Sequence, residues 1–557
     1  MTQGGPPPNE EDRSPYAGRW IARVRGQIVG QGGTPEQARQ AAAAARPKEN
    51  PEIVFMQPSS LINLSPLVDK VRAILPDREL YLVGGSVRDA LLGRVNHDLD
   101  FVLPADGIRT ARRVADKLKA DFFPLDEERD TGRVIVTNAD GSRDLLDFAT
   151  LRGGDLDADL QGRDFTVNAM ALDLRTMSLL DPLGGAADLR AKRLRACLPT
   201  SFSDDPVRIL RGVRLAAAFG FTIEAGTRKA MRAAGPLLPR VSPERLRDEL
   251  FRILEGPQPA ASLRALELLG VLPHLLPELP ALKGVEQPAP HVYDVWEHTL
   301  QVLAALEDVL AALAVGYDPE TTGDLFTGLL ALRLGRYREQ FAAHLSTALN
   351  ADRSPRGLLF FTALYHDVAK PSTRTVEEGG RVRFLEHDEL GAQAASARAR
   401  ALHLSNDEIE RVAVVIKNHM RLHYHTSRMA GGKKHPSRRA IYRFFRDSGA
   451  AGVDLVLLAL ADLRATHGQN LSQETWAACL DVCRIFLENY WERPEEVVAP
   501  PRLVDGNDMI RELGLQPGPR VGQVLEAVRE AQAMGKVSTR GEAVAFGRKW
   551  LEENPEK

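Results

Sequence analysis

One stretch, residues 81–103, restricts this chain more than any other, and it reads YLVGGSVRDALLGRVNHDLDFVL. The apolar run Tyr81–Val83 predicts a short strand, which Gly84–Gly85 interrupts. Ser86 is expected to cap a short helix, and Gly93 is expected to end it. The stretch therefore predicts a strand and a helix joined by a tight glycine turn, with a second strand to follow.

The second strand carries two aspartates that share one face. Side chains alternate along a strand, so Asp98 and Asp100 lie on one face and Leu99 and Phe101 lie on the other. Two neighbouring carboxylates repel each other unless a cation lies between them, and oxygen ligands of this kind suit a divalent metal. The glycine turn exposes backbone N–H groups, and together with the positive charge of Arg88 it suits a triphosphate.

A glycine-rich turn before a solvated Asp-x-Asp strand is the ordinary interpretation of such a pair when it stands alone. Here the spacing is G-G-x-V-R-D-x-L-L-G and then D-x-D-F, and it resembles the class II nucleotidyltransferases. That group comprises tRNA CCA-adding enzymes and bacterial poly(A) polymerases, within the DNA polymerase beta-like superfamily. The resemblance implies that Asp98 and Asp100 bind Mg²⁺ for nucleotidyl transfer to an RNA 3′ end. It also implies that Gly84, Gly85 and Arg88 cradle the triphosphate.

Length and composition narrow the class of protein. A chain of 557 residues exceeds the size of a single core, so several domains are expected. The net charge is only −3, so contact with RNA has to come from local basic patches. The sparse cysteines, Cys197, Cys479 and Cys483, fit a reducing compartment. No apolar run reaches about 18 residues and no signal peptide is recognised, so we expect a cytoplasmic protein without a membrane span.

Helical and strand patterns alternate after Asp100. A helix, IRTARRVADKLKA, precedes strands near DFFPL, GRVIVTN and RDLLDFATL, and a turn at 139–142 joins the last two strands. Asp147 lies on the last of these strands. Relatives often take a third carboxylate from a neighbouring strand, so Asp147 is predicted to be catalytic; an ordinary polar strand residue is the alternative.

The segment after Asp147, LRGGDLDADLQG, is a short acidic loop by its pattern. Many CCA-adding relatives have a longer and more basic flexible loop at this place, which helps them to switch from adding C to adding A. The short version weakens the case for full CCA addition and leaves CC-only and A-only addition open.

Residues 163–170, RDFTVNAM, resemble the R-R-D-F-T-x-N-A motif of the family, with Gly162 replacing the first arginine. The resemblance implies that Arg163 reaches the phosphate or sugar of the incoming nucleotide. It also implies that Asp164 and Asn168 hold the turn and the sugar. Residues 181–195 resemble the hinge that couples the catalytic head to the next domain.

Residues 203–214, SDDPVRILRGVR, predict a helix with a cationic face, capped by Asp205. They resemble the E-D-x-x-R motif of the family, with Asp204 in place of the glutamate. The resemblance implies that Asp205 and Arg208 read the base edge of C or A, because a carboxylate accepts hydrogen bonds and a guanidinium donates them. Two further arginines on the same helix face are expected to serve phosphates or structure: Arg211 and Arg214.

A second group of polar residues lies in the nearly all-helical part that begins near residue 258. His366 and Asp367 close an apolar stretch, with His298 before them and Asp462 after them. This order resembles the H…HD…D pattern of the HD phosphohydrolases, although isolated helical histidines are usually surface or core residues. Imidazole and carboxylate suit a transition metal or Mg²⁺ that activates water. Two more histidines are predicted to hold a second ion: His387 and His419.

Residues 428–446 interleave basic and aromatic side chains. An RNA-binding surface and a helix with buried aromatics explain this pattern equally well. The basic members are Lys433, Lys434, Arg438, Arg439, Arg443 and Arg446, and the aromatic members are Tyr442, Phe444 and Phe445. The helix–PGPRVG–helix unit that follows resembles the C-terminal module of HD-containing tRNA nucleotidyltransferases.

These patterns predict an α+β fold, with a small mixed-sheet head of the DNA polymerase beta-like type before an all-helical neck, HD domain and tail. The expected divisions are a disordered 1–15, a hairpin and helix module at 16–56, the catalytic head at 65–195, the nucleotide-selecting and RNA-binding neck at 196–257, the HD domain at 258–495, and a tRNA-binding tail at 501–557.

We expect template-independent addition of C, A or both (CCA, CC or A) to tRNA 3′ ends from CTP and ATP, with Mg²⁺ and release of pyrophosphate. Poly(A) polymerase is one alternative, although the signature G-R-R-F-R is absent from FFPLDEERDTGRV. An HD-type phosphohydrolase is the other, and a second divalent metal would serve it. The sequence gives no oligomeric state and no role for the N-terminal module.

Overall fold

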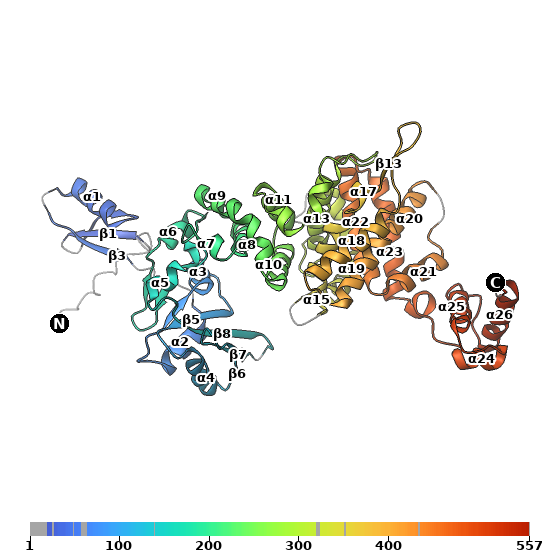
Figure 1. Cartoon of the computed structure of the whole chain (residues 1–557), viewed down its shortest axis with the longest axis horizontal. Helices are drawn as coiled ribbons and strands as arrows, with labels where there is room; N and C mark the ends of the chain where they lie inside the picture. Colours follow the sequence, from blue (N-terminus) through green and yellow to red (C-terminus); the bar gives the residue numbers. More distant parts are fainter. Residues whose placement is uncertain are drawn as a thin grey trace, which may run out of the picture. The chain divides into compact units, whose positions relative to one another are not determined.

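The computed structural model describes residues 19–24, 27–47, 49–56, 64–138, 140–318, 324–349, 353–432 and 435–555. The chain forms two compact units, Met1–Leu237 and Leu238–Lys557 (Figure 1). The first unit mixes strands and helices, and the second is almost entirely helical, so the predicted α+β class is confirmed. The boundary between the units falls inside the predicted 196–257 segment, and the finer divisions stay predictions. Among the described residues, no helix is both long and apolar enough to cross a membrane.

The predicted N-terminal hairpin and helix are present. The strands β1 (Arg19–Val24), β2 (Gln27–Gly32) and β3 (Glu52–Met56) form an antiparallel sheet in the order β2-β1-β3. Thr34 caps α1 (Pro35–Ala45), which packs so closely on β2 that a Cβ at Gly30 would lie 2.5 Å from the Ala42 nitrogen. The expected disorder at 1–15 falls outside the described residues.

A seven-stranded mixed sheet forms the head, in the order β10-β9-β4-β5-β8-β7-β6. Its central pair, β5 and β8, is parallel, and the neighbouring pairs are antiparallel. The strands are β4 (Tyr81–Val83), β5 (Asp98–Leu103), β6 (Asp121–Asp126), β7 (Thr131–Thr137), β8 (Arg143–Thr150), β9 (Ala171–Asp173) and β10 (Ser178–Leu180). The predicted strands of this region are therefore confirmed, with Ala139 of the predicted turn outside the described residues.

The two faces of the head sheet pack differently. On one face, Phe101 stacks on Phe148 with ring centroids 4.8 Å apart, and α4 (Gly107–Leu118) lies so close that a Cβ at Gly132 would be 2.7 Å from the Ala111 Cβ. The other face holds a buried apolar cluster of Tyr81, Val83, Val102, Leu160, Ala169 and Ala171. This cluster covers one end of that face and leaves the other end to polar side chains.

The remaining elements of the first unit are short helices and strands around this sheet. They are α2 (Pro66–Ile74), α3 (Gly85–Leu91), α5 (Leu156–Gln161), η2 (Thr166–Asn168), α6 (Gly185–Arg190), β11 (Arg193–Leu194), α7 (Ser201–Asp204), α8 (Arg208–Phe219), β12 (Thr222–Ile223) and α9 (Ala225–Ala234).

The second unit is a helical assembly with α22 at its centre. This helix is buried along almost its whole length, with Asp454 and Asp462 among its buried residues, and it packs along α13. The elements are η3 (Gly235–Arg240), α10 (Pro243–Glu255), α11 (Pro259–Leu268), α12 (Leu272–Leu275), η4 (Leu279–Leu282), α13 (Val295–Ala312), α14 (Leu325–Leu334), η6 (Gly335–Tyr337), α15 (Arg338–Ser346), α16 (Pro355–Tyr365), α17 (Lys370–Thr373), β13 (Arg374–Val376), β14 (Val382–Phe384), α18 (His387–Ala401), α19 (Asn406–Asn418), α20 (Met420–Ala430), α21 (Arg438–Ser448), α22 (Ala451–His467), η7 (Gly468–Asn470), α23 (Gln473–Trp491) and η8 (Pro494–Val498).

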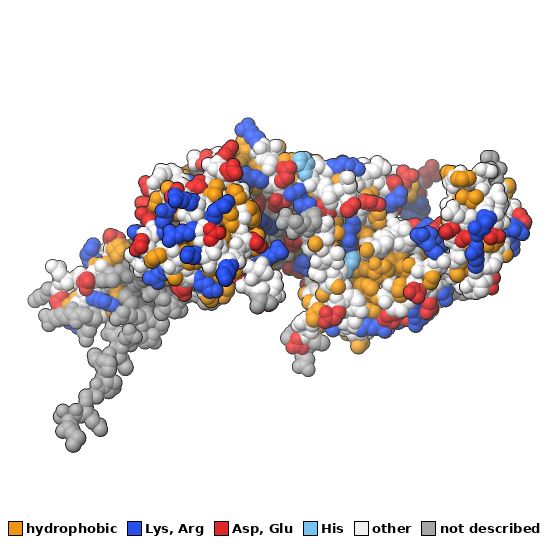
Figure 2. Space-filling view, turned by 90° about the horizontal axis from the view of Figure 1, so that it is seen from below, with side chains coloured by type: hydrophobic (Ala, Val, Ile, Leu, Met, Phe, Trp, Pro, Cys, Tyr) orange, Lys and Arg blue, Asp and Glu red, His pale blue; other side chains and the backbone are white. Residues whose placement is uncertain are grey.

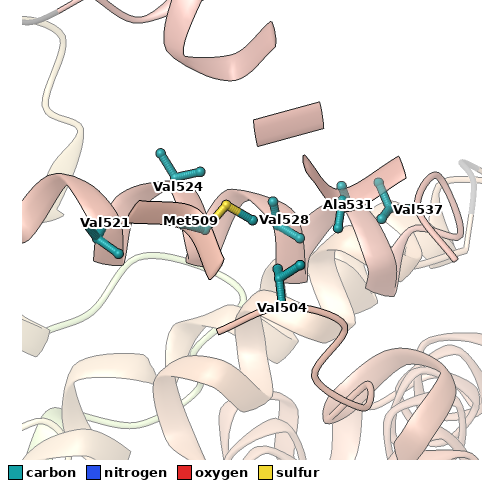
Figure 3. Packing of buried hydrophobic residues seen from close by; sticks show 8 residues of the cluster. Val504, Met509, Val521, Val524, Val528, Ala531 and Val537 are labelled. Atoms are coloured by element: carbon teal, nitrogen blue, oxygen red, sulfur yellow. The ribbon is translucent and has the colours of Figure 1, made fainter. Parts of the chain in front are cut away.

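Three helices, α24 (Gly506–Leu513), α25 (Pro519–Ala533) and α26 (Arg540–Glu553), end the chain around their own apolar core (Figure 3). Glu530 of α25 binds Arg439 and Arg443 of α21. Phe444 and Phe445 of α21 are buried. Buried aromatics and paired arginines favour the structural interpretation of this basic, aromatic segment over an RNA surface; Lys433 and Lys434 lie outside the described residues. Acidic and basic side chains are interspersed over the face seen in Figure 2.

Candidate active site and metal centre

A row of side chains in register crosses the head sheet. We call it the cross-strand row, and its members pair in the order Val83, Asp100, Asp147, Arg133 and Phe123, from β4 to β6. Residues that pair directly project from the same face of a sheet. Asp98 precedes Asp100 by two residues on this face, whereas Leu99 and Phe101 are buried on the other face. The predicted alternation along β5 is therefore confirmed.

The electrostatics of the row favour a bound cation. Burial raises the pKa of Asp100 to about 6, and repulsion from Asp147 and Asp98 adds to this effect while Arg163 opposes it. A divalent ion would relieve the repulsion and displace the proton. The chemistry of these oxygens therefore fits Mg²⁺.

Asp147 lies beside Asp100 but already has a cationic partner. The Arg133 guanidinium donates to both of its carboxylate oxygens, with an Nε–Oδ1 distance of 2.7 Å and an Nη2–Oδ2 distance of 2.6 Å. This pairing holds Asp147 in place on β8. Its predicted catalytic role stays a prediction, with an orientation that Arg133 fixes.

The glycine turn comes close to the first part of the row. Gly84 has φ of +73°, and a Cβ there would lie 3.0 Å from Arg163 Nη1 and 3.3 Å from Asp100 Oδ2. Only glycine combines this backbone with this proximity. The turn, Arg163 and Asp100 together form a compact polar corner at the start of α3.

We expect Gly84→Ala to reduce nucleotide addition at least about tenfold, because the methyl group would push Arg163 and Asp100 apart. Gly93→Ala is the matched control, since Gly93 has a similar φ of +71° and an added Cβ there has open space. Steady-state rates of both variants, with circular dichroism to check folding, measure the difference. If Gly93→Ala loses as much activity as Gly84→Ala, the strained backbone alone explains the loss, and contact with Arg163 and Asp100 does not.

One prediction about the turn needs correction, and a second stays untested. Ser86 does not cap α3: its Oγ donates to the Asp98 carbonyl at 2.8 Å and accepts from the Asp100 N–H at 3.1 Å, so it fastens α3 to β5. Arg88 is buried, where its Nη1 donates to Asn168 Oδ1 at 2.7 Å and its Nε donates to Asp89 at 2.9 Å. In this structure Arg88 supports the turn, and its contact with phosphate stays a prediction.

The 163–170 motif lies next to this turn and is held together by hydrogen bonds among its own residues. Asp164 Oδ1 accepts from the Phe165 N–H at 2.7 Å and from Asn168 Nδ2 at 3.0 Å. Burial alone would raise the pKa of Asp164, but Arg211 and these hydrogen bonds hold it below its usual value. Asp164 and Asn168 hold the turn, as predicted, and their contact with a sugar stays a prediction.

The segment at 151–162 is not a plain loop, contrary to its pattern. It contains α5, and Asp159 of that helix binds the Arg163 guanidinium at 2.9 Å. Arg208 begins α8 and donates from Nη2 to the Gly162 carbonyl at 2.8 Å, with Asp205 Oδ2 at 3.8 Å from its Nε.

Asp205 caps no helix start, because α8 begins at Arg208 and Asp205 follows the end of α7. Arg211 and Arg214 lie further along α8, and Arg211 binds Asp164 at 3.3 Å. Base selection by Asp205 and Arg208 stays a prediction.

A pocket of about 390 Å³ opens on the face of the cross-strand row. Its walls combine the acidic side chains with three arginines, which suits polyanionic ligands next to a metal. The lining includes Asp100, Leu125, Arg129, Asp147, Arg152 and Arg163.

The second unit brings the predicted HD residues together around one buried carboxylate. Asp367 Oδ2 lies 3.2 Å from His366 Nε2 and 3.6 Å from His298 Nε2, and His298 Nε2 lies 3.1 Å from Asp462 Oδ1. Asp367 Oδ1 faces His387 and His419, at 3.7 and 3.9 Å from their Nε2 atoms. Their donor atoms form two overlapping groups of three ligands, both of which contain Asp367.

The imidazoles of this HD centre are oriented as metal ligands usually are. Nδ1 of His366, His387 and His419 each faces a backbone carbonyl oxygen three residues earlier, at 2.7, 2.8 and 2.6 Å. With Nδ1 donating, Nε2 of a neutral ring keeps its lone pair. Burial alone would lower the pKa of His366, but Asp367 raises it, so a metal ion would displace a proton from that ring. Burial lowers the pKa of His419 to about 3, which keeps that ring neutral. The residues present therefore fit one or two divalent ions.

Comparisons with known proteins agree with this arrangement. Residues 80–195 match the poly A polymerase head domain, 220–282 the probable RNA and SrmB-binding site of polymerase A, and 295–462 the HD domain. The A-adding tRNA nucleotidyltransferase of Deinococcus radiodurans is 34% identical over 85% of this chain and 96% of its own. The CC-adding enzyme of Thermus thermophilus is 34% identical over 85% of this chain and 94% of its own. The chain belongs to the tRNA nucleotidyltransferase family.

Solved structures of this family share the fold. The apo form of a CCA-adding enzyme aligns with a TM-score of 0.55 at 22% identity, over 87% of this chain and 94% of that one. The Thermotoga maritima CCA-adding enzyme with tRNA aligns with a TM-score of 0.53 at 21% identity, over 88% and 98%. Like its relatives, this tRNA nucleotidyltransferase is a template-independent enzyme.

Sequence patterns missed two residues that this member of the tRNA nucleotidyltransferase family places in its HD centre. His423 Nε2 lies 2.8 Å from Asp462 Oδ2, and Lys370 Nζ lies 2.6 Å from Asp367 Oδ2. Burial alone would raise the pKa of Asp367, but His366 and Lys370 hold it well below its usual range. Only the i+3 spacing of Lys370 from Asp367 offered a signal in the sequence.

Proposed function

We propose that this enzyme adds part of the CCA end to tRNA, using CTP or ATP as the nucleotide donor. The observation that carries the proposal is the cross-strand row, in which Asp98, Asp100 and Asp147 share a face next to the Gly84 turn and Arg163. Acidic residues beside a cationic, glycine-lined corner are what phosphoryl transfer requires, because the transition state spreads negative charge over oxygens that must be held in line.

In this proposal, Asp98 and Asp100 hold Mg²⁺, which when bound neutralises phosphate charge and lowers the pKa of the RNA hydroxyl. Arg163 and the N–H groups at the start of α3 bind the triphosphate. Arg133 keeps Asp147 oriented toward the RNA 3′ hydroxyl, which attacks the α-phosphate in line while pyrophosphate leaves on the side of the Gly84 turn. Asp205 and Arg208 select the base, with Arg211 and Arg214 near the phosphates.

Partial addition is favoured over full CCA addition by two observations. The segment between β8 and η2 is short and contains α5, which Asp159 ties to Arg163, so it offers little length for a mobile loop. Relatives matched over most of their length are A-adding or CC-adding enzymes, as in Deinococcus radiodurans, Thermus thermophilus and Geobacter sulfurreducens.

The test uses one tRNA prepared with three ends: N, NC and NCC. With labelled CTP and ATP, we expect either addition of C that stops at NCC, or addition of a single A to NCC only. Complete CCA on the N end would overturn partial addition. Long A-tails on any RNA would show instead that the enzyme is a poly(A) polymerase.

The HD centre supports a second activity, hydrolysis of a phosphate ester. His298, His366, Asp367 and Asp462 would hold a divalent ion, with His387 and His419 available to a second. When bound, such an ion supplies an activated water at neutral pH. Release of phosphate from 2′-phosphate or 2′,3′-cyclic substrates, lost in His366→Ala and retained in Asp98→Asn, is the expected result.

A further inference from the structure

The direction of the reaction divides the cross-strand row into two sides. In-line attack requires the nucleophile to approach opposite the leaving group. The Gly84 turn and Arg163 lie on the β4 side of Asp100, where the proposed function places the departing pyrophosphate. The RNA 3′ hydroxyl then has to arrive from the opposite side, over β8, β7 and β6. The side chains that face solvent there are the first that an entering RNA strand meets.

Those side chains include two exposed apolar groups on the edge strand β6. Phe123 is 39% exposed and Leu125 is 43% exposed. Phe123 ends the cross-strand row, because it pairs with Arg133, which pairs with Asp147. Leu125 lines the same pocket as Asp100 and Asp147. An edge strand usually avoids exposed apolar side chains, since they promote pairing with other chains.

Both arginines and aspartates surround this apolar pair, and Arg129 lies 3.6 Å from the Asp126 carboxylate. Arg133 lies between Asp147 and Phe123 in the row, and two of its nitrogens are engaged by Asp147. Arg129 and Arg152 line the pocket together with Leu125. Aromatic or apolar surface for bases, next to arginines for phosphates, is the pattern by which proteins bind single-stranded nucleic acid. Three strand spacings separate Phe123 from Asp100, roughly 14 Å, so the two can be bridged by the end of one RNA strand.

We propose that Phe123 and Leu125 form a stacking platform for the terminal nucleotides of the acceptor RNA, with Arg133 and Arg129 binding their phosphates. This inference rests on the proposed function, because it takes the side of the departing pyrophosphate from it. The platform holds the RNA 3′ end over Asp147 and leaves the nucleoside triphosphate to the β4 side.

The test compares Phe123→Ala, Leu125→Ala and Phe123→Tyr with the native chain, using tRNA that lacks its added nucleotides. Loss of one stacking contact is expected to raise KM for the RNA about tenfold in Phe123→Ala, with KM for the nucleoside triphosphate unchanged. Phe123→Tyr should keep the native KM for the RNA, because the tyrosine ring stacks equally well. Val376→Ala, at a side chain that is 56% exposed on β13, is the control for loss of an exposed apolar group.

A second readout does not depend on catalysis. An RNA with 5-iodouridine at its 3′ end is irradiated on the native chain, and the crosslinked peptide is identified by mass spectrometry. We expect the crosslink within β6, at Phe123, and its loss in Phe123→Ala. Unchanged RNA KM in Phe123→Ala, or a crosslink that maps elsewhere, would overturn the platform. Failure of the native chain to add any nucleotide would instead refute the proposed function, and the crosslink distinguishes the two results.

Discussion

Asp100→Asn is expected to reduce nucleotide addition at least about a thousandfold while the protein remains folded. The substitution keeps the shape of a side chain that lies beside Gly84 and in register with Asp147, but it removes the charge that would hold Mg²⁺. Metal stabilisation of phosphoryl transfer is worth several kcal/mol, and each 1.36 kcal/mol corresponds to a factor of ten in rate. Single-turnover addition of labelled nucleotide to a truncated tRNA measures the loss.

The matched control is Asp116→Asn, on an exposed position of α4 away from the row. Asp98→Asn should give a loss of similar size, because both carboxylates are assigned to the same ion. Circular dichroism and the unfolding temperature establish that each variant is folded. A native rate in Asp100→Asn would refute the assignment of the row as the active site.

Asp367→Asn is expected to remove the divalent metal from the HD centre and to leave nucleotide addition unchanged. Asp367 faces His366 and His298 with one oxygen and His387 and His419 with the other, so it belongs to both groups of ligands. An amide there loses the charge and half of the acceptor capacity. Metal per chain, measured by mass spectrometry after dialysis against Zn²⁺ or Mn²⁺, should fall to the background of the metal-free buffer.

Lys370 also depends on Asp367, so this variant loses an ion pair inside the protein as well. His387→Gln therefore accompanies it, because it changes a ligand of the second group and leaves both members of the Lys370–Asp367 ion pair in the chain. Asp388→Asn, at the neighbouring position on α18, is the control. Native metal content in both Asp367→Asn and His387→Gln would exclude this cluster as the binding site.

Patterns of short range were predictable from the sequence. The alternation of Asp98 and Asp100 against Leu99 and Phe101 follows from strand geometry alone, and the structure agrees. The HD residues were found because their order along the chain is distinctive, although they come from separate helices. The helix of the N-terminal module was also predicted, and it begins after Thr34, where a capping hydroxyl before Pro-Glu is a local signal.

Contacts that form only in the folded chain were not predictable. Serine often caps helices, but the Ser86 hydroxyl instead forms hydrogen bonds with β5, where Asp98 offers a carbonyl and Asp100 an N–H. Arg88 is turned inward by Asn168, which lies 80 residues later. The basic, aromatic pattern of α21 fitted an RNA surface and a structural helix equally well, and only the fold brings Glu530 of α25 against Arg439 and Arg443. His423 has no sequence neighbour that indicates Asp462.

The HD centre draws its side chains from α13, the end of α16, the start of α18, the α19–α20 junction and α22. An ion bound there would therefore link five segments of the backbone, independently of any reaction that it catalyses. A ligand that binds only the folded state stabilises it by about 2.7 kcal/mol when its concentration is a hundred times its Kd. The stability of the helical unit would then depend on the concentration of free metal, and removal of the ion would lower its unfolding temperature.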